Sequence, residues 1–246
     1  MKQYGLIGKP LGHSFSQKYF TEKFQTENID ARYDLYPLNN IEEVTELINN
    51  TPNLVGFNVT IPYKQQILPY LNALDDEAAN VGAVNVVEIS RTNSGIYLKG
   101  YNSDIYGFYN SIKPLLKPWH TNALILGTGG ASKAVSAMLR KLNIEFTFVS
   151  RTAKDGQLTY NDLTPEVMNE HKVIVNCSPL GTYPNTDTCP DIPYQLITPQ
   201  HLAYDLVYNP KLTLFLSKAQ QQGATIKNGL EMLHLQAEAA WKYWNE

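Results

Sequence analysis

The sequence is poor in the residues that mark metal, redox and nucleic-acid-binding proteins. Its two cysteines, Cys177 and Cys189, lack the CxxC spacing of a zinc or redox site and are too few for a disulfide scaffold, so we interpret both as structural thiols. Five scattered histidines with no HExxH pattern give no support for a metal site. The net charge of -3 comes without a basic run, which argues against a nucleic-acid partner.

Long apolar runs are missing as well. No segment approaches the roughly 20 apolar residues that a membrane-spanning helix requires. The N-terminus enters a predicted strand at Gln3 without the apolar region of a signal peptide, so we expect a cytoplasmic protein with no membrane partner. With 246 residues, of which 43% are hydrophobic and 17% charged, the chain is long enough for two modest domains or one large α/β unit.

What is present is an alternation of strand and helix patterns. Apolar, β-favouring runs alternate with stretches of about 10 to 15 residues that have helical spacing, which predicts an α/β fold with a mostly parallel sheet covered on both faces. Strands are expected at 3–7, 31–38, 54–59, 122–126, 145–150, 173–176 and 202–206, a hairpin at 83–90 and 96–100, and helices at 16–27, 41–50, from 75, at 104–116, 130–141 and 230–245.

The stretch from Gly56 to Lys64 leads from a buried strand into polar residues. We expect a helix to begin there, because Thr60 can cap it and Pro62 is tolerated in a first turn. Lys64 would then lie where the helix dipole disfavours a cation by roughly 0.3–1 kcal/mol. On position alone Lys64 is a solvated surface lysine and Asp104 is a helix cap. Together they suggest chemistry, since a carboxylate beside a partly buried lysine can exchange protons with a reacting hydroxyl or carbonyl.

Other polar side chains stand at strand ends, where parallel sheets bind ligands. Ser14 and Ser16 mark a helix start that suits an anionic ligand, although a capping Ser16 and a solvated Ser14 are the simpler interpretation. Asn85 is an amide in an apolar strand and needs hydrogen-bond partners if buried, whether for structure or for binding. Gln236 lies near the apolar stripe of the last helix, and solvent exposure explains it equally well.

A glycine-rich loop follows the strand predicted at 122–126. Gly127 and Gly129 match the first two glycines of the dinucleotide fingerprint, Gly130 is an additional glycine, and Ser132 takes the third position. A helix and a second strand follow in the order of a βαβ unit, so a pyrophosphate would meet backbone N–H groups at the helix N-terminus. The alternative is a glycine-rich turn without a ligand. The loops after the strands at 173–176 and 202–206 are expected on the same, cofactor-binding side.

The end of the second strand of this unit predicts the choice of cofactor. An acidic residue there would bind a ribose 2′-hydroxyl, whereas an arginine accommodates a 2′-phosphate. Arg151 lies close to the expected spacing from Gly127, and Ser150 stands where an acidic residue would bind NAD. The sequence therefore favours NADP over NAD, with an ordinary surface arginine as the alternative.

Taken together, these segments resemble the shikimate dehydrogenase family over nearly the whole chain, from Gly5 to Gln236. No single segment decides the resemblance, but their order and spacing together are specific. The matching segments are Ser14-Phe15-Ser16, Asn58-Val59-Thr60-Ile61-Pro62-Tyr63-Lys64, Asn85, Asn102-Ser103-Asp104, Gly127-Thr128-Gly129-Gly130-Ala131-Ser132, Ser150-Arg151-Thr152, Asp205-Leu206-Val207-Tyr208 and Gly229-Leu230-Glu231-Met232-Leu233-His234-Leu235-Gln236.

The resemblance implies an NADPH-dependent, reversible reduction of 3-dehydroshikimate to shikimate by a monomer or homodimer. It implies a substrate domain at 1–101 plus 232–246, a Rossmann-type NADP-binding domain at 102–231, and a cleft between them. Lys64 and Asp104 would be the catalytic pair. The implied substrate-binding residues are Ser14, Ser16, Asn58, Thr60, Asn85, Asp104, Tyr208 and Gln236, and the implied cofactor-binding residues are Gly127, Gly129, Gly130, Ala131, Ser150, Arg151, Thr152 and Gly229.

Departures from the family pattern are local. Gln17 follows the serine pair where the family commonly has proline, and Ser150 replaces the usual asparagine before Arg151. Asp155 stands where a second basic residue often supports the 2′-phosphate, with Lys154 one position earlier. Three alternatives remain: a quinate/shikimate dehydrogenase that uses NAD, a ligand-sensing protein of the same fold without catalysis, and an unrelated two-domain dehydrogenase acting on an amino acid or a folate.

Overall fold

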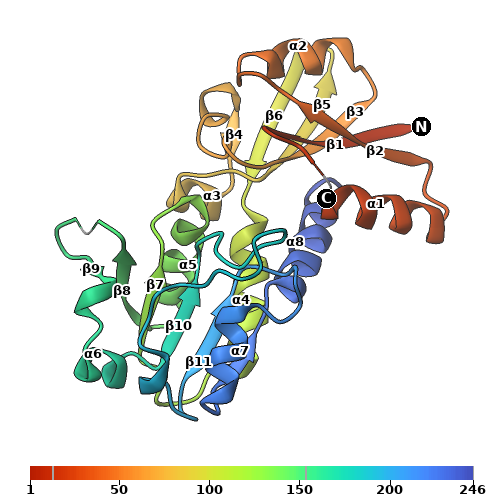
Figure 1. Ribbon diagram of the computed structural model, residues 1–246. Helices are drawn as coiled ribbons and strands as arrows, with labels where there is room; N and C mark the ends of the chain where they lie inside the picture. The colour runs from red at the N-terminus through yellow and green to blue at the C-terminus, as the bar shows by residue number, and fades with distance from the viewer. Residues whose placement is uncertain (13, 153, 246) are drawn as a thin grey trace. The chain divides into compact units, whose positions relative to one another are not determined.

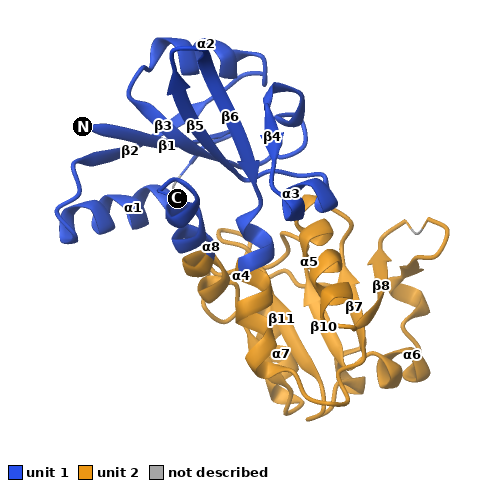
Figure 2. Ribbon diagram, turned by 180° about the vertical axis from the view of Figure 1, so that it is seen from behind, with its two compact units in different colours: residues 1–106, 236–246 blue, residues 107–235 orange. Residues whose placement is uncertain are grey.

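The computed structural model describes residues 1–12, 14–152 and 154–245, and the chain forms two compact units (Figure 2). Unit 1 comprises residues 1–106 and 236–246, and unit 2 comprises residues 107–235. The chain passes from one unit to the other within helices α4 (Ser103–Ile112) and α8 (Leu230–Tyr243). The borders expected from the sequence lie a few residues earlier, before residues 102 and 232. In the part of the chain that is described, no helix has the length and hydrophobicity to cross a membrane.

Unit 1 is built on a six-stranded sheet in the order β2-β1-β3-β5-β6-β4. Strand β5 runs antiparallel to its neighbours β3 and β6, and the other pairs are parallel. The period of two along β1 sends Tyr4 and Leu6 to one face and Ile7 to the other. The strands are β1 (Lys2–Gly8), β2 (Ala31–Pro37), β3 (Leu54–Val59), β4 (Ala73–Leu74), β5 (Val86–Thr92) and β6 (Gly95–Tyr101).

Helices cover both faces of this sheet (Figure 1). Helix α1 (Phe15–Thr26) and the C-terminal part of α8 pack on the face of Tyr4, while α2 (Glu43–Asn50) packs on the opposite face. The Trp244 indole lies against Gly56, where a Cβ atom would overlap the ring, and its Nε1 donates to the Val87 carbonyl oxygen at 3.0 Å. A glycine in β3 therefore lets the end of the chain complete the core of unit 1.

Unit 2 contains a six-stranded sheet in the order β12-β11-β10-β7-β8-β9, in which every pair is parallel. Numbered from β7, this is the strand order 3-2-1-4-5-6 of a Rossmann fold, with its switch point between β7 and β10. The strands are β7 (Asn122–Leu126), β8 (Glu145–Ser150), β9 (Leu158–Thr159), β10 (Val173–Asn176), β11 (Leu202–Asp205) and β12 (Thr225–Lys227). The predicted α/β class with mostly parallel sheets is confirmed.

The remaining helices include several that the sequence patterns did not predict. Helix α3 (Asp76–Val81) begins as expected, because Asp75 accepts from the Ala78 N–H at 2.8 Å. Unit 2 contains α5 (Gly130–Lys141), α6 (Pro165–Glu170) and α7 (Leu214–Gln221), of which only α5 was predicted. Short 3-10 helices are η1 (Leu68–Tyr70), η2 (Lys113–Leu115), η3 (Tyr160–Asp162) and η4 (Tyr194–Leu196).

The prediction that a helix begins at Pro62 is wrong. Residues 61–67 form turns that lead into the 3-10 helix η1. The carbonyl of Lys64 accepts from the Val84 N–H at 2.8 Å, so a tertiary contact occupies a group that a helix would use for its own ladder. Pro69 also lacks the N–H that a continuing helix needs. Lys64 therefore does not lie in the first turn of a helix, and no helix dipole disfavours its charge.

Two buried histidines of unit 2 make its stability sensitive to acid. In His201, Nδ1 accepts from the Thr198 N–H at 3.0 Å and Nε2 lies 2.9 Å from the Met168 carbonyl oxygen, a pairing that only the neutral ring satisfies. Burial lowers the pKa of His201 and of His120 below the usual 6.5. The unfolded chain therefore takes up more protons once the pH falls below about 6.5, and stability is lost in that direction.

Protonation of the buried Asp205 carboxyl, whose pKa is raised to about 6, acts in the opposite direction but is one group against two. We predict that the melting temperature falls between about pH 7.5 and pH 5.5, and falls less steeply in His201→Asn, whose side chain does not titrate. Thermal unfolding across this range measures the difference in slope. His234→Asn, a change at an exposed histidine, is the matched control and keeps the wild-type slope. Identical slopes in wild type and His201→Asn would contradict the prediction.

Candidate active site

The lysine and carboxylate singled out in the sequence form an ion pair in unit 1. Lys64 Nζ lies 2.6 Å from Asp104 Oδ2, with the lysine side chain 22% exposed and the aspartate side chain 10% exposed. The second carboxylate oxygen, Oδ1, accepts from Asn85 Nδ2 at 2.9 Å. The carboxylate is thus held on both oxygens, while the ammonium keeps one side open to a ligand.

The segment before β5 fixes both members of the pair. The Val84 N–H holds the Lys64 carbonyl, and the Ser103 N–H donates to Asn85 Oδ1 at 2.7 Å. Asn102 caps α4 by accepting from the Ile105 N–H at 3.4 Å. Since Asp104 is in the first turn of α4, these contacts set its position relative to Lys64.

A chain of hydrogen-bonded polar groups leads from this pair towards α1. Asn58 Nδ2 donates to the Asn85 carbonyl oxygen at 3.2 Å, and the Tyr33 hydroxyl donates to Asn58 Oδ1 at 2.7 Å. Burial raises the pKa of Tyr33 well above 10, against a hydrogen bond with Ser16 that lowers it, so the phenol stays protonated. Tyr33 was missed at the sequence level, because a tyrosine in a strand carries no signal beyond β-propensity.

The other predicted substrate residues are distributed over both units. Ser14, and not Ser16, caps α1, because its hydroxyl accepts from the Gln17 N–H at 3.3 Å. Thr60 is half-buried directly after β3, and Gln236 is half-buried on the part of α8 that belongs to unit 1. Tyr208 is half-buried after β11 in unit 2. Unit 1 therefore brings together Lys64, Asp104, Asn85, Asn58 and Ser16 through direct contacts and the Tyr33 bridge.

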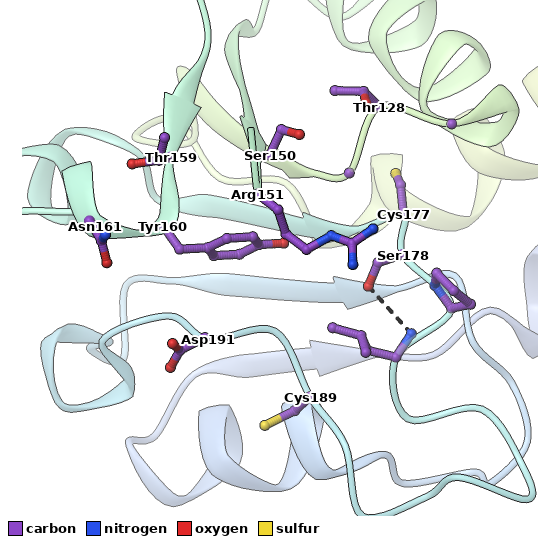
Figure 3. A pocket seen from close by; sticks show the side chains of 14 residues that line it. Thr128, Ser150, Arg151, Thr159, Tyr160, Asn161, Cys177, Ser178, Cys189 and Asp191 are labelled. Atoms are coloured by element: carbon purple, nitrogen blue, oxygen red, sulfur yellow. Dashed lines mark hydrogen bonds between the residues drawn. The ribbon is translucent and has the colours of Figure 1, made fainter. Parts of the chain in front are cut away.

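Unit 2 contains a pocket of about 700 Å³ at the carboxyl ends of β7, β8 and β10, beside the switch point (Figure 3). This volume is in the range of cofactor sites. Four of the predicted cofactor residues line it: Gly127, Gly129, Ser150 and Arg151. Its other lining residues are Thr128, Thr159, Tyr160, Asn161, Cys177, Ser178, Pro179, Leu180, Cys189 and Asp191.

The glycine loop has the geometry that a dinucleotide requires. Gly127 has a φ of +103°, in the left-handed region that favours glycine. A Cβ atom on Gly129 or Gly130 would meet no other atom within 4 Å, so both face open space, and Gly129 caps α5 without a side chain over the helix end. The first N–H groups of α5 are therefore accessible to a phosphate.

The remaining predicted cofactor residues are Gly130, Ala131, Thr152 and Gly229, and these are not among the lining residues. Gly229 has a packing role: a Cβ atom there would overlap the Leu206 carbonyl oxygen. Among the described residues, no group of three or more His, Cys, Asp or Glu side chains is placed to hold a metal ion.

Comparison with known proteins identifies the family. The model of the shikimate dehydrogenase substrate binding domain matches residues 6–87. The shikimate dehydrogenase (NADP(+)) of Methanococcus aeolicus is 34% identical over 99% of this chain and 91% of its own length, and that of Crocosphaera subtropica is 36% identical over 99% and 90%. The chain belongs to the shikimate dehydrogenase family.

Solved shikimate dehydrogenases have the same fold. The crystal structure of the enzyme from Aquifex aeolicus has a TM-score of 0.85 at 32% identity, covering 99% of this chain and 92% of the other. The structure of the Thermus thermophilus enzyme in complex with NADP(H) and shikimate has a TM-score of 0.84 at 28% identity, with 99% and 93% covered.

The sequence patterns did not predict two residues at one end of the pocket of this member of the shikimate dehydrogenase family. Tyr160 and Asn161 lie in η3, and the ring of Tyr160 lies near Arg151 (Figure 3). Burial is the largest effect on the pKa of Tyr160 and raises it. The nearby charge of Arg151 acts to lower this pKa, and that of Asp191 acts to raise it. The Thr159 hydroxyl and N–H both donate to Asp162, a capping box that was readable as Thr-x-x-Asp.

Proposed function

We propose that the protein catalyses the reversible NADPH-dependent reduction of 3-dehydroshikimate to shikimate, a step in making aromatic amino acid precursors. The observation that carries the proposal is the partly buried Lys64–Asp104 pair, which Asn85 holds in place. It stands in a chain that is 34% identical to a shikimate dehydrogenase (NADP(+)) over 99% of this chain. A protein that only binds a ligand has no need of a coupled lysine and carboxylate.

The proton chemistry is assigned to Lys64. In reduction the carbonyl carbon gains a hydride, which NADPH supplies when bound, and the oxygen gains a proton from Lys64 Nζ; oxidation of shikimate reverses both transfers. Asp104 orients the ammonium at 2.6 Å and stabilises its charge, and Asn85 fixes the carboxylate through Oδ1. The lysine side chain is partly exposed, so its Nζ can meet the reacting oxygen.

Substrate recognition is assigned by chemistry. Hydroxyl groups of Ser14, Ser16 and Tyr208 suit the carboxylate of shikimate, with Ser16 tied to Tyr33. Amides and hydroxyls suit the ring hydroxyls, since each can donate and accept, and the Asp104 carboxylate can accept from a ring hydroxyl. The residues assigned to the ring hydroxyls are Asn58, Thr60, Asn85, Gln236 and Asp104. Asn58 and Asn85 support this assignment because they belong to the same hydrogen-bonded chain as Asp104.

The residues of the unit 2 pocket fit NADP. The glycine loop and the first turn of α5, with Gly127, Gly129, Gly130 and Ala131, suit the pyrophosphate, because no side chain covers this helix end. Ser150, Arg151 and Thr152, at and beyond the end of β8, suit the 2′-phosphate, with the guanidinium as the charged partner. The family pattern also assigns Gly229 to the cofactor, although its close approach to Leu206 by itself explains a glycine there.

A spectrophotometric assay of shikimate and quinate, each with NADP and with NAD, tests the proposal. We expect nicotinamide reduction to be fastest with shikimate and NADP. Equal or faster reaction of quinate with NAD would favour the quinate/shikimate alternative, and no reaction with any pair would favour a binding protein or a different dehydrogenase. The cytoplasmic location and the monomer or homodimer remain predictions from the sequence.

Tyr33→Phe should raise KM for shikimate about three- to tenfold with little change in kcat. The substitution removes the hydroxyl that holds Asn58 Oδ1 at 2.7 Å, and a typical hydrogen bond contributes about 0.5–1.5 kcal/mol. Tyr36→Phe on the same strand removes a hydroxyl that contacts Gln3 and Asp34 and is the matched control. If both variants have the KM of wild type, Tyr33 does not position Asn58 for substrate.

A further inference from the structure

A buried polar chain runs from the end of β11 to the rim of the nucleotide pocket. Asp205 and Asn176 are fully buried at the carboxyl ends of the paired strands β11 and β10. Asn176 Nδ2 donates to Asp205 Oδ1 at 2.9 Å. Asn176 Oδ1 in turn accepts from the Ser178 N–H at 3.0 Å and from the Ser178 hydroxyl at 2.6 Å.

The carboxylate decides which way the amide of Asn176 points. An ionised Asp205 can only accept, so it selects the NH₂ end of Asn176 and turns the carbonyl end towards Ser178. Val207 N–H also donates to Oδ1 at 3.0 Å, while the Thr213 hydroxyl donates to Oδ2 at 2.6 Å. The two carboxylate oxygens thus have different partners: Oδ1 accepts from Asn176, before the loop after β10, and from Val207, whereas Oδ2 accepts from the capping residue of α7.

The orientation of Asn176 reaches the pocket through the peptide that joins Cys177 to Ser178. A Cβ atom on Gly127 would lie 3.4 Å from the Ser178 nitrogen, so the glycine loop packs directly on this peptide. The Ser178 hydroxyl also accepts from the Leu180 N–H at 3.4 Å (Figure 3). Both Ser178 and Leu180 line the pocket. If the Asn176 amide turned over, the Ser178 N–H would lose its acceptor. The peptide on which the glycine loop packs would then no longer be fixed.

We infer that Asp205 is a positioning residue for NADP, acting through Asn176 to fix the Cys177–Ser178 peptide beneath the glycine loop. The inference rests on the proposed function, because it takes the pocket of unit 2 as the NADP site. A competing explanation is that Asp205 serves stability alone, through the cap of α7. The separate use of Oδ1 and Oδ2 allows the two roles to be distinguished.

The burial of this carboxylate supports a role in positioning. Burial raises the pKa of Asp205 to about 6, against the hydrogen bonds from Thr213, Val207 and Asn176 that lower it. Ionisation of a buried acid above that pH costs stability, which an apolar side chain would avoid. Above about pH 7 the group is nevertheless an obligatory acceptor, which is the property that the orientation of Asn176 needs.

The test is an exchange of donor and acceptor by isosteric substitutions. In Asn176→Asp a second carboxylate faces Asp205 and the amide donor between them is lost. The two groups repel each other wherever both are ionised, although an acceptor for Ser178 remains. In Asn176→Asp/Asp205→Asn the new amide donates to the new carboxylate and restores that contact, while the hydrogen bond from the Val207 N–H to Oδ1 is lost. Thr213→Val removes the hydrogen bond to Oδ2 and the cap of α7 but leaves the chain to Ser178 intact, which makes it the matched control.

NADP⁺ affinity of the full chain is measured by titration calorimetry at about pH 8, with the melting temperature and the KM for shikimate of each variant. We expect Asn176→Asp to weaken NADP⁺ about tenfold or more without a matching change in KM for shikimate, and the exchanged double variant to recover most of that affinity. Thr213→Val should lower the melting temperature and leave NADP⁺ affinity within about threefold of wild type.

An unchanged affinity in Asn176→Asp, no recovery in the double variant, or an equal loss in Thr213→Val would overturn the inference. If the single variant does not fold, the double variant decides: affinity near that of wild type supports positioning, and a loss beyond about tenfold overturns it. Failure of the wild-type chain to bind NADP⁺ would instead contradict the proposed function, so the two failures are distinguishable.

Discussion

Lys64→Ala should lower the turnover of shikimate about 100-fold or more, the scale expected when a positioned acid/base group is lost, with a much smaller change in KM. Its Nζ is the proton-carrying group assigned to the reacting oxygen, and Asp104 at 2.6 Å is held by Asn85 in a geometry that serves that lysine. Steady-state kinetics in the direction of shikimate oxidation, with saturating NADP⁺, measures the effect.

Lys18→Ala is the matched control for Lys64→Ala. Lys18 is another lysine of unit 1, but its side chain is 79% exposed and its ion pair with Glu22 lies at the surface of α1. Surface ion pairs contribute about 0–1 kcal/mol, so this variant should keep wild-type kinetics and stability. Near-normal turnover in Lys64→Ala, with the fold intact, would remove Lys64 from the mechanism.

Patterns with a local cause were readable in the sequence. Strand β3 has the bounds predicted for it, because an apolar β-favouring run is bounded by turn residues on one side and polar groups on the other. The βαβ unit from β7 to β8 was also predicted, since the glycine loop and the helical spacing after it are local signals. Strands β4 and β9 have only two residues each and are too short to show a period.

The predictions that were wrong or missing depend on contacts between distant parts of the chain. The helix expected after β3 does not form, because the Val84 N–H donates a hydrogen bond to the Lys64 carbonyl oxygen. Tyr33 became part of the candidate site only through its contact with Asn58, and Asn176 only through Asp205 on the neighbouring strand. Such pairings depend on strand order and register, which a single sequence does not specify. The pairing of Lys64 with Asp104 was predicted from residue chemistry, because a carboxylate beside a partly buried lysine can exchange protons with a reacting hydroxyl or carbonyl.

Arg151→Ala should weaken NADP⁺ about 10- to 100-fold while changing the affinity for NAD⁺ less than about threefold. The guanidinium is the charged partner assigned to the 2′-phosphate, and hydrogen bonds to charged groups contribute about 1.5–3 kcal/mol. Arg151 is exposed at the end of β8 and lines the pocket, so its removal leaves no cavity in the core. Titration of each nucleotide measures the two affinities, and Arg140→Ala, which removes an arginine packed over Phe146 outside the pocket, is the control.

The ionic strength dependence of binding adds a second test of the same assignment. Asp155 occupies the place of a second basic residue and is exposed, so Arg151 should carry most of the attraction to the 2′-phosphate. Salt screens exposed charges, with a Debye length of about 8 Å at physiological ionic strength. Added salt should therefore weaken NADP⁺ more in wild type than in Arg151→Ala, whereas equal losses of NADP⁺ and NAD⁺ in the variant would assign Arg151 to a part that the two nucleotides share.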